Sequence, residues 1–213
     1  MDLRSQLIVI EGIDGSGKST FSKRLRAALQ ERVPTSLFFE PGRESPASQE
    51  IQDILTGKIS SGENINARLS RLFYEDRIWQ LENKIAPLLE RGECVVLDRY
   101  FFSTAAYQAR DEKEVKYICD QYLANPLIIQ PALVFYLKIS PEVALNRLTL
   151  RKGEAHIFEK REKLLKIAAH YSHIFEEIYP DRQSKLFDVC ALDAEKTPQE
   201  IEALALKRVF ETE

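Results

Sequence analysis

The chain has 213 residues, of which 44% are hydrophobic and 30% are charged, and its formal net charge at pH 7 is -3. This composition is typical of a globular protein, and we expect a single domain spanning 1–213. A slightly negative chain has no overall basic surface for a nucleic-acid polymer, and no apolar run approaches the roughly 20 residues that cross a membrane. Three scattered cysteines and no signal-peptide pattern predict a cytoplasmic protein without a disulfide framework or zinc site.

Short runs with strand character alternate along the chain with longer helical patterns. We expect strands at Leu7–Ile10, Ser36–Phe39, Cys94–Leu97, Leu133–Leu137 and Leu186–Cys190. Several of these runs are apolar throughout, which is typical of strands that are buried on both faces of a parallel sheet. The helical patterns cover Lys18–Arg32, Ile65–Arg91, Lys113–Leu123, Pro141–Arg151, Glu159–Tyr179 and Pro198–Val209. This alternation predicts an α/β fold with a five-stranded parallel sheet flanked by helices.

Local signals refine some of these boundaries. Pro87 should end or kink the long helix Ile65–Arg91, because proline lacks an amide hydrogen and its ring clashes with the preceding turn. The last helix should begin at Pro198, with Thr197 as its N-cap. The stretch RKGEAHIFE, residues 151–159, carries a glycine between two charged helices and predicts a short mobile lid.

Residues 12–19 read G-I-D-G-S-G-K-S, which matches the phosphate-loop pattern G-x-x-x-x-G-K-[ST]. A predicted strand precedes this segment and a predicted helix follows it, which is the context that the motif requires. The glycines let backbone amides face a phosphate, Lys18 can reach the β- and γ-phosphates, and the Ser19 hydroxyl can bind Mg²⁺. The motif therefore predicts a nucleotide site, while the lack of an N-K-x-D base motif disfavours a GTPase switch.

A second group of polar residues follows the predicted strand Cys94–Leu97. Ligands of doubly wound sheets bind at the carboxyl ends of strands, so Asp98 should face the Mg²⁺ and Arg99 a phosphate. The plainer alternatives are a cap for Asp98 and a surface salt bridge for Arg99. The stretch Ser103–Gln108, which reads S-T-A-A-Y-Q, could surround a base edge, although a helix capped by Ser103 would also explain it.

Phe73 and Arg77 lie four residues apart and therefore share one face of the predicted helix. An aromatic ring beside a guanidinium group suits a stacked base next to a phosphate clamp. Core packing of Phe73 and an ion pair of Arg77 with Glu75 or Asp76 would explain the pattern equally well.

Together these features resemble the thymidylate kinase family of nucleoside monophosphate kinases. The matching segments are E-G-I-D-G-S-G-K-S-T at 11–20, Glu40-Pro41-Gly42, Phe73 with Arg77, Asp98-Arg99-Tyr100, Ser103–Gln108, Arg147 with Arg151, and Leu192-Asp193-Ala194. They follow the order of the family over nearly the whole chain. The resemblance implies a P-loop NTPase fold, ATP-dependent phosphorylation of dTMP to dTDP for dTTP synthesis, and a homodimer.

The resemblance also implies a role for each matching residue. Contacts with ATP are implied for Gly12, Ile13, Asp14, Gly15, Ser16, Gly17, Lys18, Ser19, Thr20 and Asp193, and Mg²⁺ binding for Ser19 and Asp98. Contacts with dTMP are implied for Asp14, Glu40, Pro41, Phe73, Arg77, Arg99, Ser103, Thr104, Tyr107 and Gln108. A catalytic role is implied for Lys18, Arg99, Arg147 and Arg151.

Within the dTMP site, the resemblance implies that Phe73 stacks on thymine and that Arg77 and Arg99 clamp the phosphate. Tyr107 would close the 2′ side of the sugar, which favours deoxyribose. Asp14 would accept a hydrogen bond from the 3′-hydroxyl, although it could instead be a turn residue that bonds its own backbone.

Two departures from the family pattern keep alternatives open. Arg43-Glu44 follows Glu40-Pro41-Gly42 where the family often has Gly-Thr, and Ile157 takes the place of the usual lid arginine. The cations that remain to meet the γ-phosphate are Arg147, Arg151, Lys152 and Arg161. One alternative is a kinase for another (deoxy)nucleoside or nucleotide, with Glu40 as a possible base. The other is a nucleotide-binding protein with weak catalysis.

Overall fold

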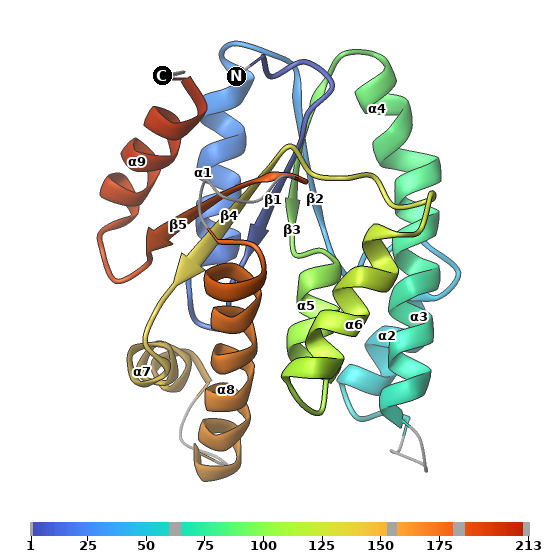
Figure 1. Ribbon diagram of the computed structural model, residues 1–213, viewed down its shortest axis with the longest axis vertical. Coiled ribbons are helices and arrows are strands. Elements are labelled where there is room, and N and C mark those ends of the chain that lie inside the picture. Colours follow the sequence, from blue (N-terminus) through green and yellow to red (C-terminus); the bar gives the residue numbers. More distant parts are fainter. Residues whose placement is uncertain (1, 60–64, 153–156, 181–185, 211–213) are drawn as a thin grey trace.

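In the computed structural model, a central sheet separates two layers of helices (Figure 1). The structure describes residues 2–59, 65–152, 157–180 and 186–210, and the side chains of residues 151, 152 and 157–160 lie outside that description. The lid predicted at 151–159 centres on residues 153–156, which are not among the described residues. The predicted lid therefore stays a prediction from the sequence. The same holds for the roles of the Arg151 and Lys152 side chains and for the substitution at Ile157.

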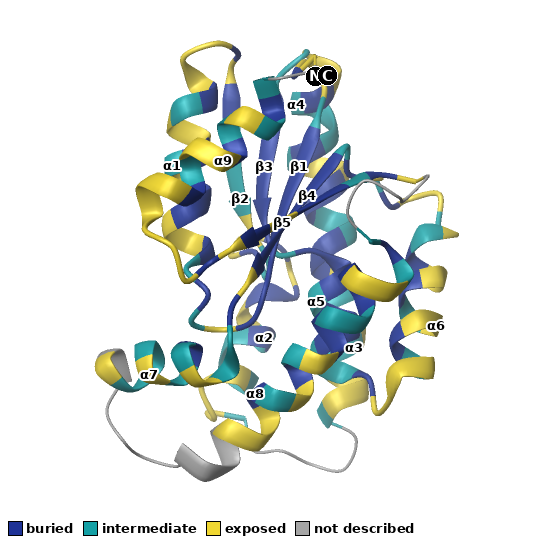
Figure 2. Cartoon of the chain, turned by 60° about the vertical axis from the view of Figure 1, so that its left-hand side comes forward, coloured by how far each residue is buried: buried dark blue, intermediate teal, exposed yellow. Residues whose placement is uncertain are grey.

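All five strands of the sheet are parallel, as predicted. The strands are β1 (Leu7–Glu11), β2 (Thr35–Phe39), β3 (Cys94–Asp98), β4 (Leu133–Lys138) and β5 (Asp188–Asp193), in the order β2-β3-β1-β4-β5. Every residue of β1 and β3 is buried, which explains why both runs are apolar (Figure 2). The register pairs Ile10 with Asp98, so the carboxyl ends of these two neighbours lie side by side.

The predicted helices are present, with shifted boundaries and two additions, Ser48–Leu55 and Phe101–Gln108, the second of which has Tyr100 and not Ser103 as its N-cap. They are α1 (Lys18–Gln30), α2 (Ser48–Leu55), α3 (Ile65–Gln80), α4 (Ala86–Glu90), α5 (Phe101–Gln108), α6 (Glu112–Leu123), α7 (Pro141–Lys152), α8 (Ile157–Ser172) and α9 (Pro198–Phe210). Helices α1 and α9 cover one face of the sheet, and α4, α5 and α8 lie on the other (Figure 1). The fold class predicted from the sequence is therefore confirmed.

Three local differences from the sequence prediction have physical reasons. The long helix is divided, because α3 passes through a π-helical segment, Leu81–Ile85, into α4, whose first turn holds Pro87. Proline fits a first turn well, because its missing amide hydrogen would have no partner there. Helix α2, which we did not predict, has only eight residues, and its Ile51 packs with Ala47 and Leu72 in a small separate cluster. Strand β5 begins at Asp188, two residues later than expected.

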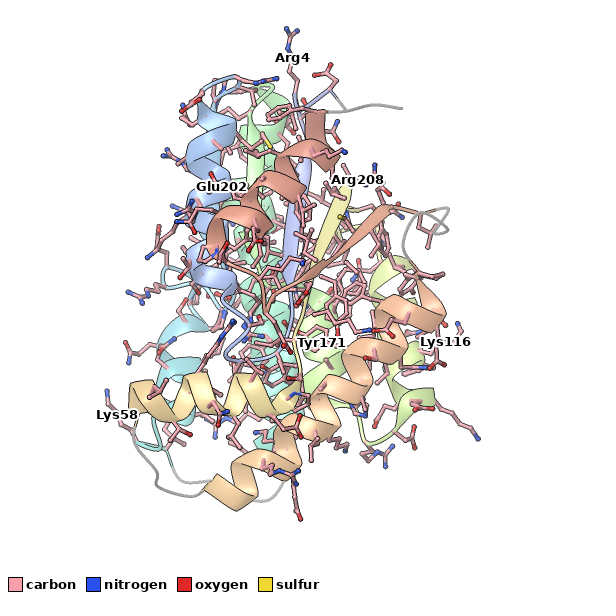
Figure 3. All side chains as sticks on the ribbon, turned by 90° about the vertical axis from the view of Figure 1, so that its left-hand side faces the viewer. Arg4, Lys58, Lys116, Tyr171, Glu202 and Arg208 are labelled. Carbon is pink, nitrogen blue, oxygen red and sulfur yellow. The ribbon has the colours of Figure 1, made fainter. Side chains whose placement is uncertain are left out.

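Helix α9 is fixed to both of its neighbours by ion pairs. Glu202 accepts a hydrogen bond from Arg24 Nε of α1 at 2.6 Å, and Arg208 pairs with Asp188 at the start of β5 (Figure 3). The predicted cap is also present: the Glu200 amide donates to Thr197 Oγ1 at 3.3 Å, and the Thr197 amide donates to Glu200 Oε2 at 2.9 Å. This reciprocal pair is a capping box, which satisfies two backbone donors at once.

Removing this cap should measurably weaken the fold. Thr197→Ala is expected to lower the free energy of unfolding by about 0.5–2 kcal/mol, because the Glu200 amide loses its acceptor. Urea unfolding followed by circular dichroism measures the change. Thr149→Ala is the control, because the Thr149 hydroxyl only bonds the carbonyl of Leu145 within helix α7 and alanine favours a helix interior. Equal losses in both variants would contradict the assigned cap.

Candidate active site

The loop between β1 and α1 wraps closely around the start of the helix. Gly17, with φ of +94°, is the N-cap of α1, and the Ser16 amide donates to the Ile13 carbonyl at 3.2 Å. Gly15 has φ of +88°, and a Cβ atom at this position would lie 2.6 Å from the carbonyl oxygen of Ala144. Only glycine fits there without displacing the backbone of α7, so the sequence pattern of the loop reflects its packing as well as its chemistry.

The Lys18 ammonium group lies inside the loop. Its Nζ donates to the carbonyl oxygens of Gly12 and Ile13, both at 2.8 Å, and the residue is 6% exposed. Burial and the charge of Arg99 lower the pKa of Lys18 and three nearby carboxylates raise it, which leaves the pKa at about 7. An anion held by the loop would therefore meet a lysine whose charge depends on pH near neutrality.

Ser19 and Asp98 meet as the parallel register requires. Ser19 Oγ donates to Asp98 Oδ2 at 2.8 Å, from the first turn of α1 to the last residue of β3. A hydroxyl and a carboxylate oxygen are ligands that suit Mg²⁺. Among the residues that the structure describes there is no cluster of three or more His, Cys, Asp or Glu side chains that could enclose a metal. This pair therefore fits Mg²⁺ that takes its other ligands from phosphates and water.

Arg99 lies between the loop and helix α5. Its Nη2 pairs with the Asp14 carboxylate and donates to Tyr107 Oη at 3.3 Å, while Nη1 donates to Ser103 Oγ at 3.1 Å. The guanidinium carbon is 5.1 Å from the centre of the Tyr107 ring, which is close enough for a cation–π interaction. Asp14 thus reaches across the site to Arg99, and Arg99 forms its ion pair inside the site.

Arg77 forms a buried, bidentate ion pair with Glu40. Arg77 Nε is 2.9 Å from both Glu40 oxygens, and Nη2 donates to Thr104 Oγ1 at 3.2 Å. The partner of Arg77 is therefore Glu40 at the end of β2, and not Glu75 or Asp76. Burial raises the pKa of Glu40 to about 7, against the opposing effect of the Arg77 charge. Arg77 Nη1 is buried and has no hydrogen-bond partner among the described residues, so the donors of this nitrogen are candidates for a ligand contact.

Asp76, which sequence analysis did not select, fixes the loop that carries Glu40. It accepts hydrogen bonds from the Gly42 amide at 2.7 Å, Gln80 Nε2 at 3.1 Å and Ser48 Oγ at 3.3 Å. A Cβ atom on Gly42 would lie 2.7 Å from Gln80 Nε2. The signal in the sequence was the position of Asp76 directly before Arg77. Side chains of adjacent helix residues point in different directions, so the Asp76 carboxylate faces the loop at Gly42 and not Arg77.

A cavity of about 400 Å³ borders the phosphate loop and the loop after β5. Its walls are Gly15, Ser16, Gly17, Thr20, Phe21, Leu137, Arg147, Leu150, Ala194, Lys196, Pro198 and Ile201. Arg147 Nη1 approaches the Gly15 carbonyl oxygen at 3.5 Å, so this predicted residue does lie beside the loop. Asp193 does not line this cavity but a neighbouring one, and its carboxylate accepts from the Glu195 amide at 3.0 Å. Arg161, by contrast, pairs with Glu142 at 3.6 Å.

A second cavity, of about 280 Å³, brings together all ten residues for which substrate contact was predicted. Its walls are Asp14, Glu40, Pro41, Leu55, Asn66, Leu69, Phe73, Arg77, Arg99, Tyr100, Ser103, Thr104, Tyr107, Gln108 and Lys163. Sequence analysis missed Leu55 of the unpredicted α2 and Lys163 of α8, which add apolar and cationic surface. Phe73 lines the cavity and also packs against the small cluster around Ile51, so its core packing is confirmed in part and its stacking on a base stays a prediction.

Comparison with known proteins agrees with this geometry. The family model described as thymidylate kinase matches residues 10–202. The chain belongs to the thymidylate kinase family. It is similar to the thymidylate kinase of Leptospira borgpetersenii serovar Hardjo-bovis (strain L550), with 38% identity over 91% of this chain and 88% of the relative. A probable thymidylate kinase of Methanosarcina barkeri (strain Fusaro) is 33% identical over 98% of each chain.

Thymidylate kinases act on nucleotides. Separately, no helix within the described part of this chain has the length and apolar character to cross a membrane. Lys18, Ser19 and Asp98 lie at the phosphate loop, and the two arginines at 77 and 99 line the neighbouring cavity of about 280 Å³. Kinases of this family use ATP.

The low pKa of Lys18 predicts that ATP binding takes up a proton. At pH 8 a lysine with a pKa of about 7 is mostly neutral, and the phosphates of ATP should raise this pKa and recharge the amine. Titration calorimetry in buffers of different ionisation enthalpy should then report uptake of close to one proton at pH 8 and little at pH 6. Lys18→Arg, which stays charged at both values, should bind ATP without that uptake. The same uptake in this variant would contradict the assignment to Lys18.

Proposed function

We propose that this chain transfers the γ-phosphoryl group of ATP to dTMP, which yields ADP and dTDP for the synthesis of dTTP. One observation carries the proposal: consecutive residues of the phosphate loop border both cavities. Gly15, Ser16 and Gly17 line the cavity of about 400 Å³, while the preceding Asp14 lines the cavity of about 280 Å³. A donor phosphate in the first cavity and an acceptor phosphate in the second would meet beside this loop.

On the donor side, ATP would place its phosphates on the loop from Gly12 to Thr20. The amides of the loop and the N-terminus of α1 attract anions, and Lys18 adds its charge when it is protonated. Adenine would lie near the turn after Asp193, where Ala194 and Lys196 line the cavity. Arg147 would approach the triphosphate from α7, and Arg151 is proposed for the same role on the basis of its position in the sequence.

On the acceptor side, thymine would stack on Phe73, with Thr104 and Gln108 at the base edge and Tyr107 beside the sugar. The lining of the cavity supports this arrangement, because these residues surround one space. Arg77 and Arg99 would hold the phosphate. Both arginines already pair with carboxylates, so the phosphate would have to compete with Glu40 and Asp14 for them.

Mg²⁺ is proposed as the metal that accompanies ATP, held by Ser19 and Asp98. When bound, it would neutralise part of the phosphate charge. We also propose, from family resemblance, that the chain forms a homodimer, acts in the cytoplasm and closes residues 151–159 as a lid. The descriptions of the relatives do not extend to these three points.

The reaction needs positioning more than acid–base chemistry. A dTMP phosphate oxygen attacks the γ-phosphorus in line, the bond to the β,γ-bridging oxygen breaks, and that oxygen leaves with ADP. No general base is required, because the attacking oxygen is already ionised at pH 7. Lys18, Arg99 and Arg147 would stabilise charge on the transferring group. Exclusion of water around the two phosphates would limit hydrolysis of ATP.

An assay of ADP release across dTMP, dUMP, UMP, CMP and thymidine tests the proposal. We expect turnover with dTMP, and Lys18→Ala should abolish it without unfolding the protein, because the lost charge acts on the transferring phosphates. Phosphorylation of thymidine but not dTMP would favour a nucleoside kinase with Glu40 as its base. Binding of both nucleotides without turnover would favour the binding protein with weak catalysis.

Asp14 provides a sharper test of how dTMP is held. Asp14→Asn keeps the shape of the side chain but removes its charge, and a hydrogen bond to a charged group contributes about 1.5–3 kcal/mol. The catalytic efficiency for dTMP should therefore fall about tenfold to a hundredfold, with little change in the KM for ATP. The wild type should use 3′-deoxythymidine monophosphate poorly, and the two losses should not add, because both remove the same contact. Weaker ATP binding with normal use of dTMP would instead make Asp14 a loop-shaping residue.

A further inference from the structure

A fully buried carboxylate lies beneath the phosphate loop. Glu11, the last residue of β1, is 0% exposed. Its Oε1 accepts hydrogen bonds from the amides of Tyr100 at 2.7 Å and Ser103 at 3.2 Å. Its Oε2 accepts from Ser103 Oγ at 2.7 Å and from Tyr171 Oη at 2.8 Å. The carboxylate thus connects β1, the start of α5 and the last turn of α8.

Burial raises the pKa of Glu11, while the hydrogen bonds from Ser103, Tyr171 and the Tyr100 amide and the charge of Arg99 favour its ionised form. Both backbone amides are donors only, and each of the two hydroxyl groups can direct its hydrogen at Oε2. An ionised carboxylate is an acceptor on both oxygens and matches all four partners. A glutamine in its place could accept from the two amides and donate to the two hydroxyl oxygens, so it would keep the shape of the network and remove the charge.

The same contacts fix the position of Arg99. Arg99 has φ of +77°, a left-handed conformation that is unfavourable for a residue with a long side chain. Glu11 binds the amide of the next residue, Tyr100, and so holds the chain immediately after this strained position. The Ser103 hydroxyl that donates to Glu11 also accepts from Arg99 Nη1 at 3.1 Å. Both the backbone and the guanidinium group of Arg99 are therefore held through Glu11.

We propose that Glu11 is a positioning residue for phosphoryl transfer, which holds Arg99 towards the shared phosphate region through Ser103 and the Tyr100 amide, with Tyr171 completing the network from α8. This assignment rests on the proposed function, because it concerns the arginine that meets the transferring phosphate. Glu11 itself lines neither of the two cavities beside the phosphate loop, so it acts through Arg99 and not on the substrate.

Tyr171 offers a way to perturb the network without removing its packing. It lies near the centre of the molecule, where α8 approaches the strand ends (Figure 3). Its ring stacks with those of Tyr136 and Phe175, at centroid distances of 6.0 and 6.2 Å. Tyr171→Phe keeps these ring contacts and removes only the hydroxyl group that reaches Glu11. Tyr136→Phe is a matched control from the same stack, because the Tyr136 hydroxyl bonds Ser172 instead.

The experiment is a double-mutant cycle between Tyr171→Phe and Arg99→Lys, measured as kcat and KM for each substrate. Tyr171→Phe should lower kcat about three- to tenfold, the effect of one lost hydrogen bond, with the KM for ATP unchanged. In the Arg99→Lys background, Tyr171→Phe should cause no further loss, because its target is already gone. Tyr136→Phe should keep the kcat of the wild type.

A purely structural role gives a different result. It would lower the melting temperature while leaving kcat intact, or it would give losses in kcat that multiply fully across the cycle, and either outcome overturns the proposal. Glu11→Gln provides a second check: if it folds, its kcat should fall further than that of Tyr171→Phe, and wild-type kcat would contradict the assignment. The cycle uses whichever acceptor the wild type phosphorylates, so inactivity with dTMP alone counts against the proposed function and not against the role of Glu11.

Discussion

A charge that leaves water is costly unless opposite charges or hydrogen bonds surround it. At the carboxyl ends of β1 and β3 this chain buries Glu11, Lys18 and Asp98, and Arg99 lies beside them. Each group is matched: Glu11 by four donors, Lys18 by two carbonyls, and Asp98 by the Ser19 hydroxyl. If Glu11, Lys18 or Asp98 lost its partners, a buried charge would be left unpaired. This cost keeps the phosphate loop, the start of α5 and helix α8 in their relative positions.

Much of this centre could be predicted because it depends on strand order. The loop motif lies at the end of one apolar run and Asp98-Arg99 at the end of another, and parallel neighbours place those ends together. The contact of Ser19 with Asp98 follows from that alignment alone. The grouping of Phe73, Thr104 and Tyr107 around one cavity was predicted through family resemblance, because their spacing along the chain does not define a shared site.

Partner choice among charged side chains could not be predicted, because it depends on distances that only the folded chain sets. Arg77 has Glu75 and Asp76 close by in sequence, yet neighbours in a helix point in different directions, and the partner is Glu40, which immediately follows β2. Asp76 is then available to fix the loop at Gly42. Asp193 shows a related limit: we expected it in the loop after the last strand, whereas it is the last residue of β5 and lines a cavity next to the phosphate-loop cavity. A one-residue step along a strand reverses the face that a side chain occupies.

The ion pairs also suggest how the site remains stable before and after substrate binds. Arg77 and Arg99 line the acceptor cavity, and each is paired with a carboxylate from the same cavity, Glu40 or Asp14. Without these carboxylates, the two positively charged guanidinium groups would repel each other within one small cavity. In the proposed complex, the dTMP phosphate would bring its own negative charge and would replace Asp14 at Arg99, while the Asp14 carboxylate would turn to the sugar hydroxyl. The exchange trades one charge-assisted hydrogen bond for another, and its net free energy is small compared with that of either bond. Binding would therefore be selective for ligands that carry both a phosphate and a sugar hydroxyl. A ligand with the phosphate alone would displace Asp14 from Arg99 without offering the Asp14 carboxylate a new hydrogen bond.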